Sequence, residues 1–501
     1  MPLLPPDGAL DLPGARVRSV GVSGQVDAVA LEGPGIAARG DARDLDEQLA
    51  EHAVPGAGAR ALAAALARQN LRPVLAVPLD DLATAPGAGP VRGLDGEPAV
   101  ELTVDAPPDG EGQVILEVDA AGVVSWHWAA PAEQVADGVR AGLEQVFRIP
   151  VRQLDVPGDG PPGEADRGLF GIGTKKLLQL LRYPVERVAG TAGRLLVTAW
   201  ESHHRPYRLS RLDAPGPLGP DDLRALSGLP TLLLVHGTFS TCGSAFDGIL
   251  RDAAFLARMR DRYGSRVLLF DHPSLHVDPA ANARWLLKQL PPEAELVLDV
   301  VAHSRGGLVA RALASGPVAA EAARRPATLR TTVHIATPNA GTVLADPKRW
   351  GDLLDSMTNL VTLFPDDTVS VPLTAVLETV KQIGTGVIDG LDGLSAMTPG
   401  SQWLSQLAPA PGAAGEKTYA VASDFDPVSA PLPVRALNVL VDPFFGEGND
   451  LVVPTKGVSH AAGLTVDDTL VLPQTPAVSH TTYFQDEVVR TRIANWLPQR
   501  T

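Results

Sequence analysis

The sequence predicts an α/β protein, with a mostly parallel sheet flanked by helices and a smaller strand-rich domain before it. In the second part of the chain, short apolar runs alternate with segments of helical spacing. These runs are TLLLVHG (231–237), RVLLFDH (266–272), ELVLDVVAH (295–303), TTVHIATP (331–338) and KTYAVASD (417–424). Such runs are typical of strands in a parallel sheet that helices cover on both faces.

The first part of the chain has a different pattern. Short strand-like runs such as RPVLAVPL (72–79) alternate with Pro- and Gly-rich turns, and one alanine-rich helix is expected at 58–70. We therefore expect a strand-rich domain over 1–156 and a Pro/Gly-rich linker over 157–168. A helix is expected at 174–188, within a second domain spanning 169–501. The first domain shows no chemical motif, so we assign it no activity and keep a protein partner open as its role.

Composition limits the possible functions. The 501 residues include 42 basic and 58 acidic side chains, a formal charge of −16, which argues against nucleic acid and anionic membrane surfaces as partners. The N-terminus lacks the basic and apolar segments of a signal peptide, and no apolar stretch is long enough to span a bilayer. The single cysteine, Cys242, fits a reducing compartment, so we expect a cytoplasmic protein. We expect no membrane insertion, no cofactor and no metal.

The stretch VLDVVAHSRGGLVARAL (297–313) predicts a catalytic nucleophile. A buried strand runs into Ala302-His303-Ser304-Arg305-Gly306, and a helix follows directly. This matches the nucleophile elbow, usually G-x-S-x-G, in which a sharp turn exposes the serine at the carboxyl edge of a sheet. Alanine replaces the first glycine, and one methyl group is tolerable there. Ser304 is therefore the predicted nucleophile.

A second stretch, TLLLVHGTFST (231–241), predicts an oxyanion hole. A hydrolytic serine needs backbone N–H donors where negative charge develops on the substrate oxygen. We assign one donor to Thr238 and the second to Arg305 at the start of the helix after the elbow. His236 precedes the nucleophile in the chain and is interpreted as a structural loop residue, and His303 likewise as structural.

The order of VHGTFST (235–241), AHSRGGLVAR (302–311) and IATPNAGT (335–342) resembles lipases and esterases of the α/β-hydrolase superfamily. The resemblance extends from about Leu169 to the C-terminus and leaves the first domain unexplained. It implies an α/β-hydrolase fold with Ser304 as nucleophile and His236-Gly237-Thr238 as the oxyanion loop. It also implies a triad in the chain order serine, acid, histidine.

His480, in PAVSHTTYF (476–484), lies where the resemblance places the catalytic histidine, and His460 is the alternative. For the acid we choose Asp450, because DLVVP (450–454) resembles the D-x-V-V-P run that carries this residue in many such hydrolases. Asp424 and Asp426 follow a clear buried strand and remain the alternatives.

Residues 350–407 depart from the strand and helix alternation and are predicted to form an apolar, partly helical cap over the active site. An added helix pair that serves stability alone is the alternative. The whole pattern predicts a serine hydrolase acting on a small-molecule or lipid-like carboxylic ester. A thioesterase, amidase or acyltransferase would use the same triad, and a non-catalytic interaction protein on this scaffold is the alternative from another class.

Overall fold

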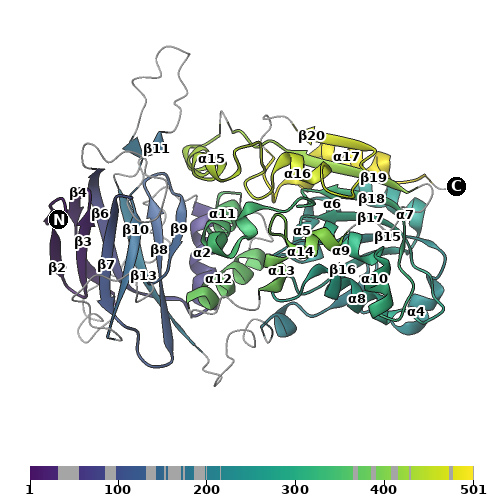
Figure 1. Cartoon of the computed structure of the whole chain (residues 1–501), viewed down its shortest axis with the longest axis horizontal. Helices are drawn as coiled ribbons and strands as arrows, with labels where there is room; N and C mark the ends of the chain where they lie inside the picture. Colours follow the sequence, from purple (N-terminus) through teal and green to yellow (C-terminus); the bar gives the residue numbers. More distant parts are fainter. Residues whose placement is uncertain are drawn as a thin grey trace, which may run out of the picture.

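The computed structural model describes residues 1–31, 56–84, 97–130, 143–151, 154–155, 171–172, 175–185, 198, 200–214, 216–364, 370–384, 391–407, 416–427, 430–472 and 478–499. Antiparallel sheets lie at one end of the molecule and a mostly parallel sheet lies at the other (Figure 1). Helices α2, α11 and α12 lie between them (Figure 1). The predicted linker at 157–168 falls outside the described residues, so the domain division stays a prediction.

The first part of the chain forms two antiparallel sheets packed face to face. In the larger sheet the order is β1 (Leu3–Leu4), β4 (Val22–Val26), β6 (Arg72–Thr84), β13 (Lys176–Pro184), β8 (Glu111–Asp119) and β9 (Val124–His127), with β5 (Val29–Ala30) beside β6. In the smaller sheet it is β10 (Glu144–Pro150), β7 (Ala99–Asp105), β3 (Ala15–Val20) and β2 (Ala9–Leu12). An apolar core that includes Leu102, Phe147 and Leu178 fills the space between them. A two-stranded ribbon joins β11 (Leu154–Asp155) to β12 (Gly171–Ile172).

The helix expected at 174–188 is wrong, because residues 176–184 form strand β13. This strand pairs antiparallel with both β6 and β8, so it is a central strand of the larger sheet. Apolar side chains cover both of its faces: Leu178 and Leu180 face the core between the sheets, whereas Leu181 and Tyr183 face the opposite one. A strand buried on both faces loses the alternation of apolar and polar residues that marks a half-exposed strand.

The second part of the chain is built on a mostly parallel seven-stranded sheet, as the sequence predicts. Its order is β14 (Arg208–Arg211), β16 (Val267–Asp271), β15 (Pro230–Val235), β17 (Val297–His303), β18 (Thr328–Ile335), β19 (Lys417–Ser423) and β20 (Asp468–Leu472). Only β14, at one edge, runs antiparallel to its neighbour. The carboxyl ends of the parallel strands therefore meet at one edge, where the loops that carry the predicted site residues begin.

Helices cover both faces of this sheet. On one face lie α8 (Pro279–Gln289), α9 (Gly306–Leu313) and α10 (Gly316–Glu321). On the other lie α5 (Cys242–Ala245), α6 (Asp247–Leu250), α7 (Ala253–Tyr263) and α17 (Glu487–Trp496). The second part of the chain also contains α4 (Pro220–Ala225), α15 (Leu432–Phe445) and α16 (Thr455–Ser459), with a 3-10 turn η6 (Tyr483–Gln485) before α17.

Residues 350–407, the predicted cap, contain α11 (Trp350–Leu363), α12 (Ser370–Gly384), α13 (Asp392–Ser395) and α14 (Gln402–Gln406), preceded by 3-10 turns η4 (Val343–Ala345) and η5 (Pro347–Arg349). Both α11 and α12 contact α2 (Gly56–Arg68), the helix predicted in the first domain. One apolar cluster runs from the larger antiparallel sheet through these helices to the parallel sheet.

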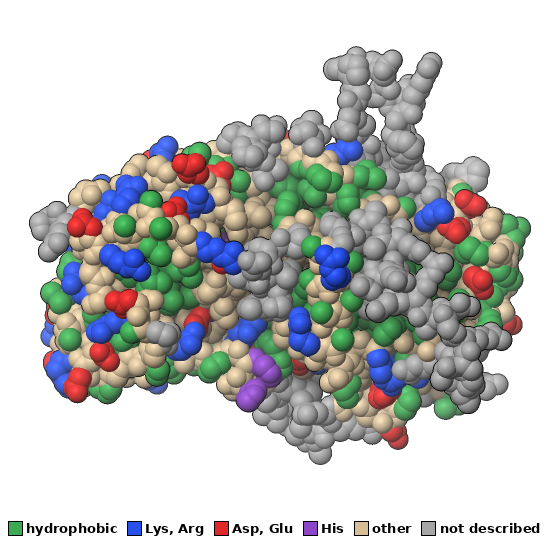
Figure 2. Space-filling view, turned by 180° about the vertical axis from the view of Figure 1, so that it is seen from behind, with side chains coloured by type: hydrophobic (Ala, Val, Ile, Leu, Met, Phe, Trp, Pro, Cys, Tyr) green, Lys and Arg blue, Asp and Glu red, His purple; other side chains and the backbone are tan. Residues whose placement is uncertain are grey.

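Within the described residues, no helix combines the length and the apolar character that crossing a bilayer requires. Figure 2 shows acidic and basic side chains interspersed over one face of the described surface, without a large patch of either sign.

Candidate active site

Ser304 lies at a sharp turn between strand β17, which ends at His303, and helix α9, which begins at Gly306. Its φ angle of 53° is in the left-handed region, which costs energy for a residue with a side chain. Gly306 is needed because a Cβ there would lie 2.3 Å from the Val235 carbonyl oxygen. Across the turn, a Cβ on Gly237 would lie 2.6 Å from Cβ of Ser304. The strand ends and the helix start therefore approach so closely that small residues are required.

The structure brings Ser304, His480 and Asp450 together in the order expected for a triad. His480 Nε2 lies 3.0 Å from Ser304 Oγ, and its Nδ1 lies 2.9 Å from Asp450 Oδ2. All three residues are buried. Because the carboxylate only accepts, Nδ1 carries the proton and Nε2 is free to accept the proton of the serine hydroxyl.

The Asp450 carboxylate is held by further donors. Its Oδ1 accepts from the backbone N–H groups of Val452, at 3.1 Å, and Val453, at 2.7 Å. Its Oδ2 also accepts from the Tyr483 hydroxyl at 2.9 Å. Burial and the neighbouring Asp450 raise the pKa of Tyr483 well above its usual range, so the phenol stays protonated as a donor. Tyr483 is not among the predicted site residues, and its one signal in the sequence is its position three residues after His480.

The alternative triad residues lie apart from this arrangement. His460 is exposed and its Nδ1 pairs with the adjacent Ser459 hydroxyl at 2.9 Å. Asp424 and Asp426 follow β19 and are half-buried, and in the described structure neither bonds to His480. The geometry thus favours Asp450 and His480 over the three alternatives.

The predicted oxyanion donors flank Ser304. Among the described residues, the backbone N–H groups of Thr238 and Arg305 donate no hydrogen bond to another protein group. The Arg305 side chain is buried and points elsewhere: its Nε donates to the Gly393 carbonyl at 3.1 Å and its Nη2 to Asn282 Oδ1 at 2.8 Å. Burial lowers the pKa of Arg305 to about 10. Arg305 thereby ties the elbow to α8 and to α13, while its N–H group remains available.

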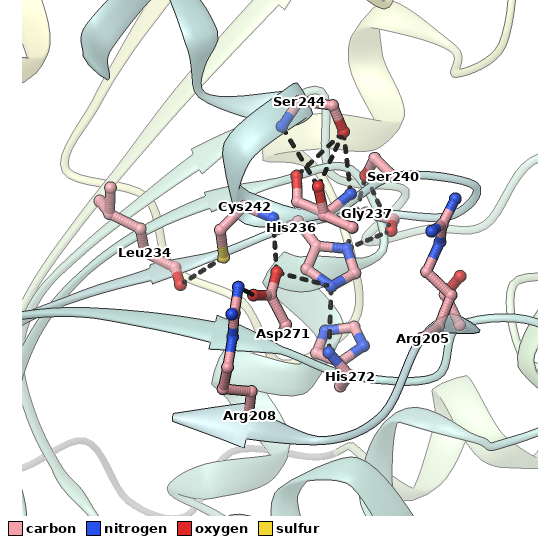
Figure 3. A network of polar contacts seen from close by, with 12 residues as sticks. Arg205, Arg208, Leu234, His236, Gly237, Ser240, Cys242, Ser244, Asp271 and His272 are labelled. Carbon is pink, nitrogen blue, oxygen red and sulfur yellow. Dashed lines mark hydrogen bonds and ion pairs between the residues drawn. The ribbon is translucent and has the colours of Figure 1, made fainter. Parts of the chain in front are cut away.

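His236 supports the loop that carries Thr238. Its Nδ1 donates to the Gly237 carbonyl at 2.7 Å, and its Nε2 accepts from the His272 backbone N–H at 3.1 Å (Figure 3). The two histidine rings stack 4.2 Å apart, and Arg208 and Cys242 bond to Asp271 beside them (Figure 3). Burial lowers the pKa of His236 and keeps it neutral. Both ring nitrogens bond to backbone groups, which agrees with the prediction that His236 is a structural loop residue.

His303 holds the loop that carries His480. Its Nε2 donates to the His480 carbonyl at 2.9 Å, and the two rings are 5.0 Å apart. Burial lowers the pKa of His303 to about 3, so this ring is neutral at physiological pH. This contact supports the predicted structural role of His303.

Ser304 and His480 open onto a cavity of about 260 Å³. Its apolar lining comes largely from α11, α12 and neighbouring loops: Phe239, Ala245, Pro338, Leu353, Met357, Val361, Phe364, Pro372, Met397, Val452 and Val453. Besides Ser304 and His480, its polar lining comes mainly from the loop after β15, α5 and the loop after His480: Thr238, Ser240, Ser244, His303, Thr342, Thr481, Thr482 and Gln485. No Asp, Glu, Lys or Arg is among the described residues that line it. In the described part of the chain, no three His, Cys, Asp or Glu side chains are grouped as metal ligands.

A known protein family includes most of the second part of the chain. A family model described as a domain of unknown function, DUF7379, matches residues 201–498, which is more than half of the chain. The chain belongs to this family. The match includes Ser304, Asp450, His480 and both predicted oxyanion donors. None of the curated proteins compared with it matches this sequence.

Several solved structures are similar over part of the chain. The phospholipase PlaB from Legionella pneumophila has 16% identity and a TM-score of 0.28, over 46% of this chain and 45% of its own. This chain thus spans less than half of that phospholipase. The metagenomic carboxyl esterase MGS0156 has 18% identity and a TM-score of 0.31, over 56% and 78% of the two chains. Lipase 1 from Pelosinus fermentans has 12% identity and a TM-score of 0.35, over 53% and 98%.

Proposed function

We propose that this protein is a serine hydrolase of the α/β-hydrolase type that cleaves carboxylic esters with an apolar acyl group. The observation that carries the proposal is the hydrogen-bonded chain from Ser304 through His480 to Asp450, opening onto a cavity with an apolar wall. A nucleophile, a base with the correct free nitrogen and an orienting acid are the groups that acyl transfer requires.

In the proposed reaction, Ser304 Oγ attacks the ester carbonyl carbon while His480 Nε2 takes the hydroxyl proton. The backbone N–H groups of Thr238 and Arg305 stabilise the negative charge that develops on the carbonyl oxygen. His480 then gives its proton to the leaving alkoxide, which departs as an alcohol. Water, deprotonated by His480, then attacks the acyl-enzyme; the bond from the acyl carbon to Ser304 Oγ breaks, His480 returns the proton to Oγ, and the acid is released. Asp450 keeps the imidazole in one tautomer and stabilises its protonated form.

The cavity lining supports an uncharged, partly apolar substrate. Leu353, Met357 and Val361 follow one another at intervals of four residues on α11 and present a continuous apolar surface to the cavity. We assign this surface to the acyl chain and residues 350–407 to a cap that excludes water from it. A charged substrate would find no partner of opposite charge among the described lining residues, so its desolvation would be unfavourable.

Labelling with an alkyl fluorophosphonate, which forms a covalent bond to an activated serine, tests the proposal. We expect the wild type to be labelled and Ser304→Ala to remain unlabelled with an unchanged circular dichroism spectrum. Hydrolysis of p-nitrophenyl esters, with matched thioester and anilide substrates, then distinguishes an esterase from a thioesterase or an amidase. A wild type that neither reacts with the probe nor turns over any of these substrates would instead support a non-catalytic interaction protein.

A further inference from the structure

Helix α11 has two faces with different partners. Leu353, Met357 and Val361 line the cavity beside Ser304. Asp355, Thr358 and Asn359 bond instead to strand β9 of the first domain. With 3.6 residues per turn, these two sets point to opposite sides of the helix. The first domain, to which the sequence assigns no activity, therefore binds the face of α11 opposite to the cavity.

The contacts behind the wall use the free edge of β9. Among the described strands, β9 is the last in its sheet, and β8 bonds to one side of it. On the other side, Asn359 Oδ1 accepts from the Val124 N–H at 2.8 Å, and Asn359 Nδ2 donates to the Val124 carbonyl at 2.7 Å. One side chain on α11 thus satisfies both backbone groups that a neighbouring strand would otherwise pair.

Trp126, two residues further along β9, makes two more contacts. Its backbone N–H donates to Asp355 Oδ1 at 2.8 Å, and its indole Nε1–H donates to Thr358 Oγ1 at 3.0 Å. Trp126, Thr358 and Asn359 are all buried. Desolvation raises the pKa of Asp355 well above its usual range, and asparagine has the same shape as this side chain.

The same docking extends to the neighbouring helices. The Trp128 indole donates to the Val380 carbonyl of α12 at 3.1 Å, and the Tyr183 hydroxyl donates to the Lys381 carbonyl at 3.2 Å. Helix α2 approaches α11 so closely that a Cβ on Gly58 would lie 2.1 Å from the Thr362 carbonyl oxygen. These contacts fix both α11 and α12 in position against α2 and the larger antiparallel sheet.

We propose that the strand-rich domain fixes the position of helix α11, which lines the acyl site. Through this contact, Trp126, Thr358 and Asn359 determine which acyl-chain lengths the enzyme prefers. This proposal rests on the proposed ester hydrolysis. A long acyl chain extends from Ser304 to the α11 wall, so a displaced helix weakens its binding. An acetyl group does not reach the wall, and the triad lies on other elements, so hydrolysis of acetate esters is preserved.

The test compares kcat/KM for p-nitrophenyl decanoate and acetate. Thr358→Val is nearly isosteric and leaves the buried Trp126 indole N–H without its acceptor. Asn359→Leu leaves both Val124 backbone groups without partners. A buried donor or acceptor left unsatisfied is costly, so we expect the decanoate-to-acetate ratio to fall about tenfold in each variant. Asp355→Asn keeps the acceptor for the Trp126 N–H and is the matched control, with an expected ratio within about twofold of wild type.

A pairwise cycle identifies the contact that is responsible. Trp126→Phe removes the indole donor, so the double variant with Thr358→Val should be no worse than Thr358→Val alone. Equal losses on both esters, or an unchanged ratio in a folded Thr358→Val protein, would overturn the proposal. Fluorophosphonate labelling separates this outcome from failure of the proposed function: labelling of the wild type and the variants with an unchanged ratio counts against the positioning role alone, whereas an unreactive wild type counts against the hydrolase itself.

Discussion

The Tyr483 hydroxyl donates a hydrogen bond of 2.9 Å to the same Asp450 oxygen that accepts from His480. A phenol that stays protonated therefore helps to orient the carboxylate that orients the imidazole. Tyr483→Phe removes one of the donors to Asp450 without changing the ring. Because the carboxylate loses one hydrogen bond from a neutral donor, we expect kcat to fall about tenfold with little change in KM. Steady-state kinetics with one ester measure this, and an unchanged kcat would show that the backbone donors suffice.

The acid is tested by three asparagine variants. Asp450→Asn should lower kcat by about 10⁴, because an amide would favour the wrong imidazole tautomer, as it does in trypsin-type triads. Asp424→Asn and Asp426→Asn are matched controls on the neighbouring loop, and we expect near-normal turnover for both. Normal turnover in Asp450→Asn together with collapse in one of the controls would move the acid to that residue.

Close packing at the elbow predicts that Gly306→Ala is damaging. Its new Cβ would lie 2.3 Å from the Val235 carbonyl oxygen and 2.6 Å from that of His236, so β15 and α9 would have to separate. We expect a loss of about 3 kcal/mol in the free energy of unfolding. Urea denaturation measures it, with Gly316→Ala, which meets nothing within 4 Å, as the control. Equal midpoints for the two variants would contradict the close approach.

Stability should decrease in acid through His334, which lies on β18 apart from the residues that line the cavity. Burial, and to a smaller extent Arg311, lowers its pKa from 6.5 to about 3. Below pH 6.5 the unfolded chain binds a proton that the folded protein excludes until about pH 3, so stability is lost as the pH falls. From pH 7 to pH 5 this amounts to about 2 kcal/mol.

Urea unfolding at both pH values, compared with His334→Asn, isolates that contribution. The comparison is needed because Asp119, whose pKa burial raises to about 6, acts in the opposite direction. We expect the wild type to lose about 2 kcal/mol more than the variant on acidification. Parallel losses in the two proteins would mean that His334 is accessible to protons.

The sequence predicts best the features that depend on nearby residues. Strands β15 to β19 carry short apolar runs, and the residues around Ser304 specify a turn that needs glycine at 306. The helix expected at 174–188 fails because β13 is buried on both faces and so lacks the period of two.

Features that join distant segments are not visible in the sequence. The Asn359 amide bonds to Val124, 235 positions away, and nothing in either local pattern indicates the pairing. The Tyr483 contact is likewise not visible in the sequence, because its hydroxyl can bond to Asp450 only when two separate loops meet at the sheet edge. Asparagine on a helix is usually interpreted as a solvent-facing or capping residue, and here tertiary structure gives it another partner.

The apolar cluster that passes from the antiparallel sheet through α11 to the parallel sheet has a thermodynamic consequence. The cluster joins residues from four elements: Leu62 of α2, Trp126 of β9, Leu354 of α11 and Val235 of β15. Domains joined by small polar interfaces melt independently, whereas a shared core couples their disruption. Heating should therefore give one cooperative transition, with a calorimetric enthalpy that matches the van't Hoff enthalpy for all of the chain.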